Sequence, residues 1–244
     1  MEQTVSSISL QNLAYAFIPV VIVFLILAKW SLSSKRAMIA ITRMLIQLLL
    51  IGYFLVAIFE SDNAYLVAFI LVVMVAFSSW IALGNLPVVK SELVKTAVIS
   101  ITLSAAFTIF VITQGVLELT PWYHPQTLLP LSGMIFASCM NSVSISGERF
   151  YAEQSNKSSY IKARNIAFQA SMIPNINALF AVGIVSLPGM MTGQILSGIS
   201  PFIAARYQIM VMCMVFACAG ISSAIFLMLV KGKSFQLKNT SNGA

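Results

Sequence analysis

Long apolar runs separated by short polar connections constrain this chain more than any other feature. A helix needs roughly 20 apolar residues to cross the hydrocarbon core of a bilayer, and each run has about that length. Hydrophobic residues make up 59% of the chain and charged residues 9%, a balance far from that of soluble domains. We therefore predict an all-α integral membrane protein, with residues 1–244 in one transmembrane domain. The predicted spans are 10–28, 37–58, 64–83, 94–116, 126–146, 167–187 and 207–230.

Charged residues between the runs predict the orientation of the helices. Connections rich in Lys and Arg alternate with connections that carry Glu60 or Glu118. Because basic residues are retained on the cytoplasmic side, we predict seven spans with the N-terminus outside and the C-terminus in the cytoplasm. This topology places every basic residue except Arg206 on the cytoplasmic side, with Arg43 just inside its span. Six spans, without the weak run at 167–187, would send the basic tail outward.

Composition and reactive side chains argue against several functional classes. The net charge of +7 is explained by the basic cytoplasmic connections, so no nucleic-acid partner is expected. The single histidine, His124, lies in a proline-rich connection, and the chain has no HExxH, Walker A or GxSxG motif. We predict a protein that is not an enzyme and holds no cofactor. We interpret Cys139, Cys213 and Cys218, all inside predicted spans, as small packing residues.

Polar side chains inside the spans are the candidate functional residues, because a charged side chain in hydrocarbon costs roughly 2.5–3.5 kcal/mol and needs a partner or a cavity. Arg43 and Gln47 lie one helical turn apart, on one face of their helix. Arg43 either reaches back to the cytoplasmic head groups or faces a cavity. In the second case we expect Glu148 or Asn141 to hold it.

The span at 126–146 ends in a polar stripe that must face protein or water. We favour hydrogen bonding between helices for its serines and select Asn141 as a candidate pathway residue. In the next span, Pro174 beside Asn175 predicts a broken or kinked helix, as transporters use to expose backbone groups. The glycines further along predict either close helix packing or a tight re-entrant turn. The stripe is Ser138, Asn141, Ser142, Ser144 and Ser146, and the glycines are Gly189, Gly193 and Gly198.

Four blocks of sequence are similar to the FetB-type permease family. They are RxxxQLxxxGY at 43–53, PLSGM at 130–134, VSLPGMMTGQ at 185–194 and YQIM at 207–210. The resemblance implies the membrane half of an ABC transporter, implicated in iron export in bacteria and linked to aluminium tolerance in plants. The blocks and the polar residues selected above together give the candidates for a transport pathway or structural core: Arg43, Gln47, Asn141, Asn175, Ser186, Pro188, Gly189, Met190, Met191, Thr192, Gly193, Gln194, Tyr207 and Gln208.

The resemblance also implies partners. A homodimeric pore in the cytoplasmic membrane would pair with two copies of a separate ATP-binding subunit, which carries ATP and Mg²⁺. The basic segment 147–166 is the expected docking site, through Arg149, Lys157, Lys162 and Arg164. It is shorter than the family pattern, and the alternative interpretation is an ordinary solvated loop.

The substrate prediction, export of a metal ion with iron first, rests on the resemblance alone. Thirteen methionines invite a soft-metal site, but methionine is a common filler of apolar interfaces, and no metal ligands are assigned. Two alternatives stay open. One is a channel or secondary transporter that works without ATP, and the other is a membrane scaffold.

Overall fold

The structure is a computed structural model that describes residues 8–61, 63–86 and 90–231. Helices make up almost all of this part of the chain, and its only β-type pairing is an isolated bridge between Val182 and Ser186. The all-α prediction is therefore confirmed. The chain divides into two compact units, Met1–Ser61 and Asp62–Ala244.

The first unit is a pair of long apolar segments. A turn at Ala16 and Phe17 divides the first predicted span into α1, Leu10–Tyr15, and α2, Ile18–Lys29. The second segment is α3, Ser34–Phe59, which packs against α2. No side chain of α1 or α2 is buried within the chain, as expected of helices whose apolar surface faces lipid or other protein.

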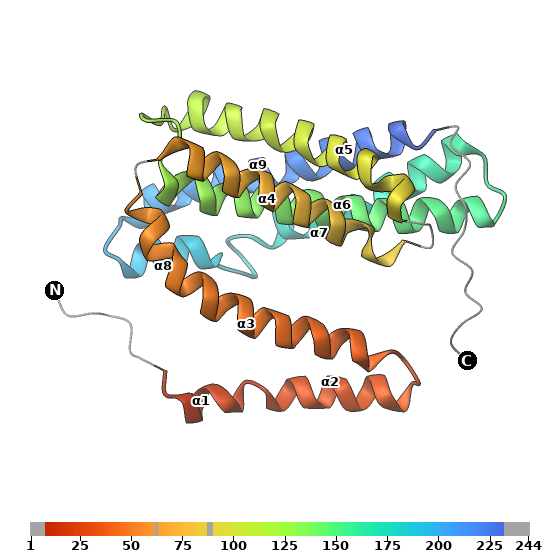
Figure 1. Cartoon of the computed structure of the whole chain (residues 1–244), viewed down its shortest axis with the longest axis horizontal. Helices are drawn as coiled ribbons and strands as arrows, with labels where there is room; N and C mark the ends of the chain where they lie inside the picture. The colour runs from red at the N-terminus through yellow and green to blue at the C-terminus, as the bar shows by residue number, and fades with distance from the viewer. Residues whose placement is uncertain (1–7, 62, 87–89, 232–244) are drawn as a thin grey trace. The chain divides into compact units, whose positions relative to one another are not determined.

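The second unit is a helical bundle (Figure 1). Local chemistry sets where its helices begin. The side chain of Asn63 accepts hydrogen bonds from the first turn of α4, Ser159 caps α7, and prolines open α6 and α9. Its elements are α4 Ala64–Ala82, the 3₁₀ turn η1 Leu83–Asn85, α5 Lys90–Phe110, the π-helix η2 Val111–Val116, α6 Pro125–Ser155, α7 Tyr160–Ala181, α8 Gly189–Leu196 and α9 Pro201–Leu229.

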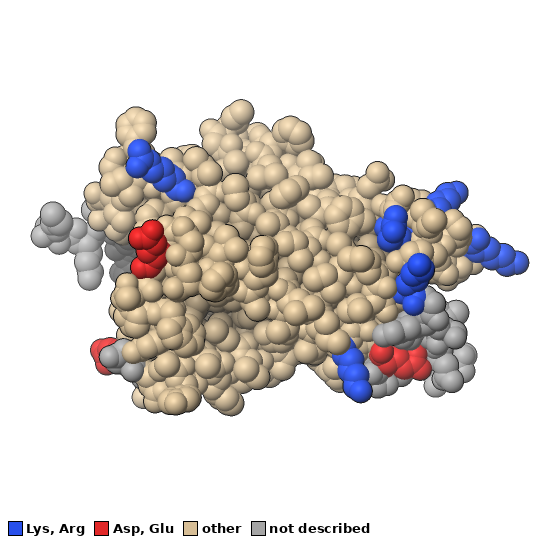
Figure 2. All heavy atoms as spheres, turned by 90° about the horizontal axis from the view of Figure 1, so that it is seen from above, with Lys and Arg blue, Asp and Glu red and all other residues tan. Residues whose placement is uncertain are grey.

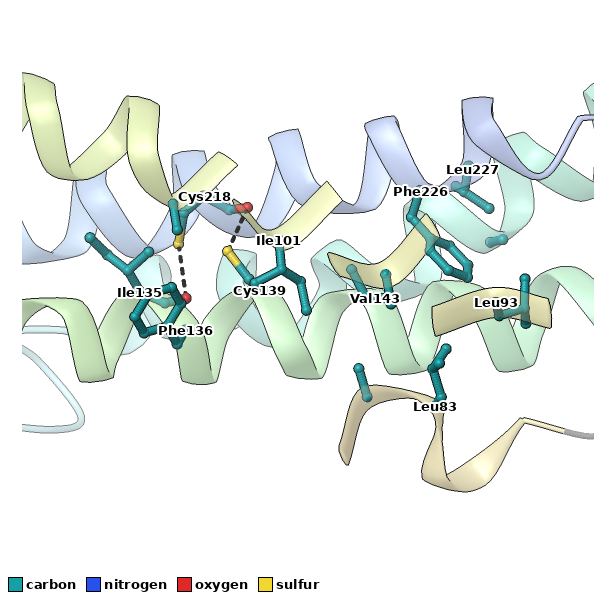
Figure 3. Packing of buried hydrophobic residues seen from close by; sticks show 14 of the residues in the cluster. Leu83, Leu93, Ile101, Ile135, Phe136, Cys139, Val143, Cys218, Phe226 and Leu227 are labelled. Atoms are coloured by element: carbon teal, nitrogen blue, oxygen red, sulfur yellow. Dashed lines mark hydrogen bonds between the residues drawn. The ribbon is translucent and has the colours of Figure 1, made fainter. Parts of the chain in front are cut away.

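The helix α6 organises the bundle, since it packs against α4, α5, α7 and α9. Figure 3 shows the apolar core that these helices share, with Ile101, Ile135, Val143 and Phe226 among its buried side chains. Gly147 on α6 permits a close approach of the Leu86 and Phe226 side chains to the α6 backbone. A Cβ atom there would lie 2.9 Å from a methyl carbon of Leu86, so a larger side chain would displace its neighbours.

Six helical segments in the described part of the chain are long and apolar enough to cross a membrane. They match six of the seven predicted spans. The seventh, 167–187, falls on α7, which does not meet the same criteria of length and composition. The seven-span topology and the placement of the two termini therefore stay predictions.

Two local predictions can be compared with the structure. The segment 147–166, expected to hold a docking helix, consists of the end of α6, a short turn and the start of α7 at Tyr160, so the alternative of one solvated loop is wrong. With 31 residues, α6 is about 46 Å long at ~1.5 Å per residue, more than the ~30 Å hydrocarbon core requires. Of the two forms predicted at Pro174, a broken helix is excluded, because α7 runs through this residue, and a kink stays a prediction. Proline there removes one hydrogen-bond donor, and the rest of α7 holds the helix together.

Candidate functional site

A seam of small polar side chains joins α6 to its neighbours inside the bundle. Serine hydroxyls on α5 and α6 donate hydrogen bonds to backbone carbonyls of α9, and these carbonyls already belong to the α9 helix. The interpretation of the α6 serines as helix-to-helix donors is confirmed for two of them. The bonds are Ser104 to Cys218, 2.9 Å, Ser138 to Val215, 3.1 Å, and Ser142 to Ala219, 2.8 Å.

Two of the three cysteines belong to the same seam. Figure 3 shows Cys139 pointing toward the Cys218 carbonyl, 3.5 Å away, and Cys218 toward the carbonyl of Ile135, 3.7 Å away. Both thiols are free and buried, which confirms their prediction as packing residues. Cys213 is free but exposed on α9, so it does not pack within the described part of the chain.

Four buried oxygen atoms have no hydrogen-bond partner among the described residues: Ser79 Oγ on α4, Ser132 Oγ, Gln194 Oε1 and Gln208 Oε1. Ser132 is fully buried on α6, and Gln208 on α9 is 6% exposed. The seam bonds show that α6 and α9 run parallel, and both residues lie about two turns before the bond between Ser138 and Val215. Since buried polar groups are nearly always paired, these oxygens mark polar chemistry that helix packing does not use.

A π-helix lies at the same end of the bundle. Ser104 contacts Cys139 and Glu92 lies near Tyr151, so α5 runs opposite to α6. The π-helix η2 follows Ser104 by two turns, as Ser132 precedes Cys139 by two turns. The hydroxyl of Thr113 in η2 is buried and donates to the Ile109 carbonyl, 2.8 Å away. π-Helical turns are frequent at functional sites. Sequence reasoning missed η2, whose only signal is Thr-Gln-Gly within an apolar run.

The block 185–194 forms a turn and a short helix between α7 and α9. Gly183 (φ +84°) donates its N–H to the Ser186 carbonyl at 3.0 Å. Pro188 directly precedes α8, and Gly198 (φ +89°) follows its C-terminal end. Glycine is required at both positive φ values. At Gly189 and Gly193 an added Cβ would meet no described atom within 4 Å. These two glycines therefore do not serve close packing against the described part of the chain.

The predicted residues of this block differ in how far their side chains are exposed. Gln194 and Met191 are half-buried, as is Pro188, while the others stay on the surface of α8 or its turn. The hydroxyl of Thr192 donates back to the Pro188 carbonyl at 3.1 Å, inside the first turn of α8. The block thus contributes Gln194 to the buried polar groups. Its exposed members are Ser186, Gly189, Met190, Thr192 and Gly193.

The remaining predicted residues add no buried oxygen without a partner in the described part of the chain. Asn141 is exposed on α6, Asn175 is half-buried on α7, and Tyr207 is exposed next to Gln208 on α9. In the first unit, Arg43 and Gln47 line one shallow hollow of about 490 Å³ on α3, as their spacing predicts. A pairing of Arg43 with Asn141 or Glu148 would join the two units and stays a prediction.

No group of three or more His, Cys, Asp or Glu side chains that could hold a metal ion occurs among residues 8–61, 63–86 and 90–231. His124 directly precedes α6, with its Nδ1 atom 3.2 Å from the Thr127 hydroxyl. Met210 and Met214 are buried in the apolar core, in agreement with the packing interpretation of the methionines.

The four predicted docking residues gather around the turn between α6 and α7. Arg149 forms an ion pair with Glu153 at 2.8 Å, and Lys157 adopts φ +58° in the turn. Lys162 is exposed, while Arg164 donates two hydrogen bonds to Asn165, at 2.9 and 3.1 Å. Figure 2 shows most of the visible basic side chains toward one end of the view, the end at which the α6–α7 turn lies in Figure 1.

These features define an all-helical, multi-pass membrane protein with unpaired polar groups inside its bundle. The chain belongs to the family described as "Uncharacterised protein family (UPF0014)", whose sequence profile matches residues 10–235. It is similar to the "Probable iron export permease protein FetB" of Escherichia coli, with 30% identity over 96% of this chain and 95% of that protein. A UPF0014 membrane protein of Synechocystis is 33% identical over 71% of this chain and 73% of its own length.

A plant protein is similar as well. The protein "ALUMINUM SENSITIVE 3" of Arabidopsis thaliana is 27% identical over 86% of this chain and 81% of its own length. No solved structure matches the chain significantly. The resemblance noted from the four sequence blocks is therefore confirmed at the level of the family.

Proposed function

We propose that this chain is the membrane-spanning permease subunit of an ATP-driven exporter of metal ions, with iron as the first candidate. The observation that carries the proposal is the similarity to the probable iron export permease over nearly the whole of both chains. The match includes both structural units and all four sequence blocks. The exporter would lie in the cytoplasmic membrane, as a homodimer with a separate ATP-binding subunit that carries ATP and Mg²⁺.

The buried oxygens of Ser132, Gln194 and Gln208 support a polar passage through the bundle. Neutral hydroxyl and amide oxygens are hard ligands, and hard ligands suit cations that otherwise prefer water or carbonyl groups. They also bind weakly, and weak binding favours passage over storage, because a transported ion must leave its site again. We propose these three residues as part of the lining of the pathway.

The basic surface at the α6–α7 turn supports a docking role. The hydroxyl of Ser158 donates to the Glu153 carboxylate at 3.1 Å, and Glu153 also binds Arg149, so the turn is held to the end of α6. A braced turn between two long helices is a suitable lever for transmitting motion from an ATPase. We propose that Arg149, Lys157 and Lys162 contact the ATP-binding subunit.

The direct test is to co-purify the chain with the ATP-binding subunit encoded nearest to it and to assay the complex in lipid vesicles. We expect a stable complex, ATP hydrolysis stimulated by iron, and iron transport that requires ATP. Iron flux that is independent of ATP would instead support the channel or secondary transporter. A folded protein that transports nothing under any condition would support the scaffold.

Charge reversal tests the docking surface with a matched control. Arg149→Glu combined with Lys162→Glu is expected to lower complex formation at least tenfold. Arg206→Glu changes an exposed arginine near the start of α9, far along the bundle from the α6–α7 turn, and should leave the complex intact. Equal complex formation by all three proteins would reject the docking surface.

A further inference from the structure

Two adjoining hollows form one groove between α7 and α9, called here the α7–α9 groove. The larger hollow has a volume of about 610 Å³, and its walls include Met172, Ile176, Phe216 and Gly220. The smaller has a volume of about 390 Å³, and its walls include Arg164, Asn165, Leu227 and Met228. Phe168 and Gln169 line both hollows, which makes the groove continuous.

The length of the groove matches one leaflet of a bilayer. Contacts between Met172 and Gly220 and between Tyr160 and Leu227 show that α7 and α9 run antiparallel. The groove extends from Arg164 to Ile176 on α7 and from Met228 to Phe216 on α9. At ~1.5 Å per residue this is about 18 Å, against ~15 Å for half of a typical hydrocarbon core.

The polarity of the groove changes along its length. Its deep end is lined by apolar side chains, whereas Arg164 and Asn165 lie at its mouth. The guanidinium carbon of Arg164 is 5.9 Å from the centre of the Tyr160 ring, and the ammonium nitrogen of Lys231 is 5.7 Å from the same centre. Within the described ranges neither cation has a carboxylate partner, since the ion pair found there joins Arg149 and Glu153. Arg164 therefore lies at the mouth, and Lys231 lies beside the same Tyr160 ring, so two positive charges without a described carboxylate partner share this end of the groove.

We propose that the α7–α9 groove binds an anionic phospholipid. Its phosphate would lie between Arg164 and Lys231, and one acyl chain would follow α9 toward Phe216. Basic residues at the membrane surface attract anionic head groups, and apolar walls accept hydrocarbon. The inference does not rest on the proposed transport function. It also separates Arg164 from the other predicted docking residues, because Arg164 would serve lipid binding and leave ATPase docking to Arg149, Lys157 and Lys162.

Native mass spectrometry of the purified full chain tests the head-group preference. We expect phosphatidylglycerol to bind on the order of tenfold more tightly than phosphatidylcholine with the same acyl chains. Arg164→Gln combined with Lys231→Gln should abolish this preference. Lys162→Gln, which removes an exposed charge from α7 outside the groove, should preserve it. Equal binding of both lipids by the unmodified chain, or an unchanged preference in the double variant, would overturn the proposal.

A second pair of variants tests the apolar end. Ala217→Phe places a ring into the deep part of the groove and should lower retention of phosphatidylglycerol at least fivefold. Cys213→Phe adds the same ring to an exposed position of α9 outside the groove and should leave retention unchanged. Equal retention by both variants would count against an acyl chain in the groove.

A photo-crosslinker at position 169 identifies the occupant without disturbing the walls of either end. Gln169 is exposed and borders both hollows. In membranes we expect crosslinked adducts with phospholipid. Adducts with a second copy of the chain, with residues 8–61 or with the ATP-binding subunit would show that protein covers the groove, and would overturn the proposal.

Discussion

The hydroxyl of Ser142 on α6 donates a 2.8 Å hydrogen bond to the backbone carbonyl of Ala219 on α9. The bond between Ser138 and Val215 repeats this relationship one turn earlier on both helices. The repeat fixes α6 and α9 in parallel register and so sets which side chains meet at each level of the bundle. At the level of Ser132 and Gln208 the register leaves polar atoms without partners.

Ser142→Ala should lower the free energy of unfolding by about 0.6 kcal/mol, and by no more than ~1.7 kcal/mol, because hydrogen bonds between membrane helices contribute this much. Thermal unfolding in detergent would measure the change. Ser144→Ala is the matched control on the same helix, since Ser144 makes no side-chain hydrogen bond within the described residues. Equal shifts for the two variants would show that the seam bond adds no stability.

Gly147→Leu should destabilise the protein by about 1–3 kcal/mol or prevent folding, because a Cβ at this position would lie 2.9 Å from Leu86 and 3.2 Å from Phe226. Gly193→Ala, on the open surface of α8, should stabilise its helix by up to ~1 kcal/mol, since alanine favours helix more than glycine. The readout is the unfolding temperature of each variant. A destabilised Gly193→Ala protein would show that residues beyond the described part, or a partner, pack against α8.

Gln208→Leu separates stability from transport. The buried Oε1 atom of Gln208 has no partner among the described residues, so an apolar side chain of similar size should preserve or raise the unfolding temperature. If Gln208 lines the pathway, iron transport in vesicles should nevertheless fall at least tenfold. Val211→Leu is a control for altered volume on the neighbouring turn. A stable Gln208→Leu protein with full transport would remove Gln208 from the pathway.

The sequence predicts the apolar elements of this fold well, because lipid imposes one length and one composition on every spanning helix. It also predicts the role of Ser138 and Ser142, since a serine stripe in an apolar helix requires internal partners. The end of α6 could not be predicted in this way. Beyond Ser146 the helix becomes polar, and hydropathy cannot distinguish a polar helix from a loop.

The candidate site was harder to predict than the fold. The family blocks point to Gln194 and Gln208 as site residues, whereas nothing in the block 130–134 distinguishes Ser132 from its neighbours. Its importance depends on burial and on the absence of a partner within the described residues, which only the packing of α6 in the bundle establishes. The π-helix η2 could not be predicted either, because its six residues have no pattern of apolar and polar positions that distinguishes them from an α-helix.

Arg149→Ala should change the free energy of unfolding by less than about 1 kcal/mol. Its ion pair with Glu153 is close, at 2.8 Å, but the arginine side chain is 47% exposed, and solvent screens such pairs. Chemical unfolding of the purified chain would measure the effect. A small change would allow any loss of ATPase binding in this variant to be assigned to the lost contact. A change above ~2 kcal/mol would show that the pair is structural.

The segment between α7 and α8 should lie against lipid. Ile184 is 90% exposed and Val185 is 81% exposed, and such apolar side chains favour a membrane or a protein surface over water. The helix α8 has eight residues, about 12 Å, so it is too short to cross the ~30 Å core alone. We therefore expect the segment to enter one face of the membrane and return, or to rest at its surface.

A spin label at Ile184→Cys tests this placement, after the three native cysteines are replaced by alanine or serine. In bilayers the label should collide more often with dissolved oxygen, which concentrates in hydrocarbon, than with a water-soluble nickel complex. A label at Lys157→Cys, in the polar α6–α7 turn, should show the opposite ratio. Preference for the nickel complex at position 184 would place the segment in water, as an external loop, and would leave its exposed apolar surface to a protein partner.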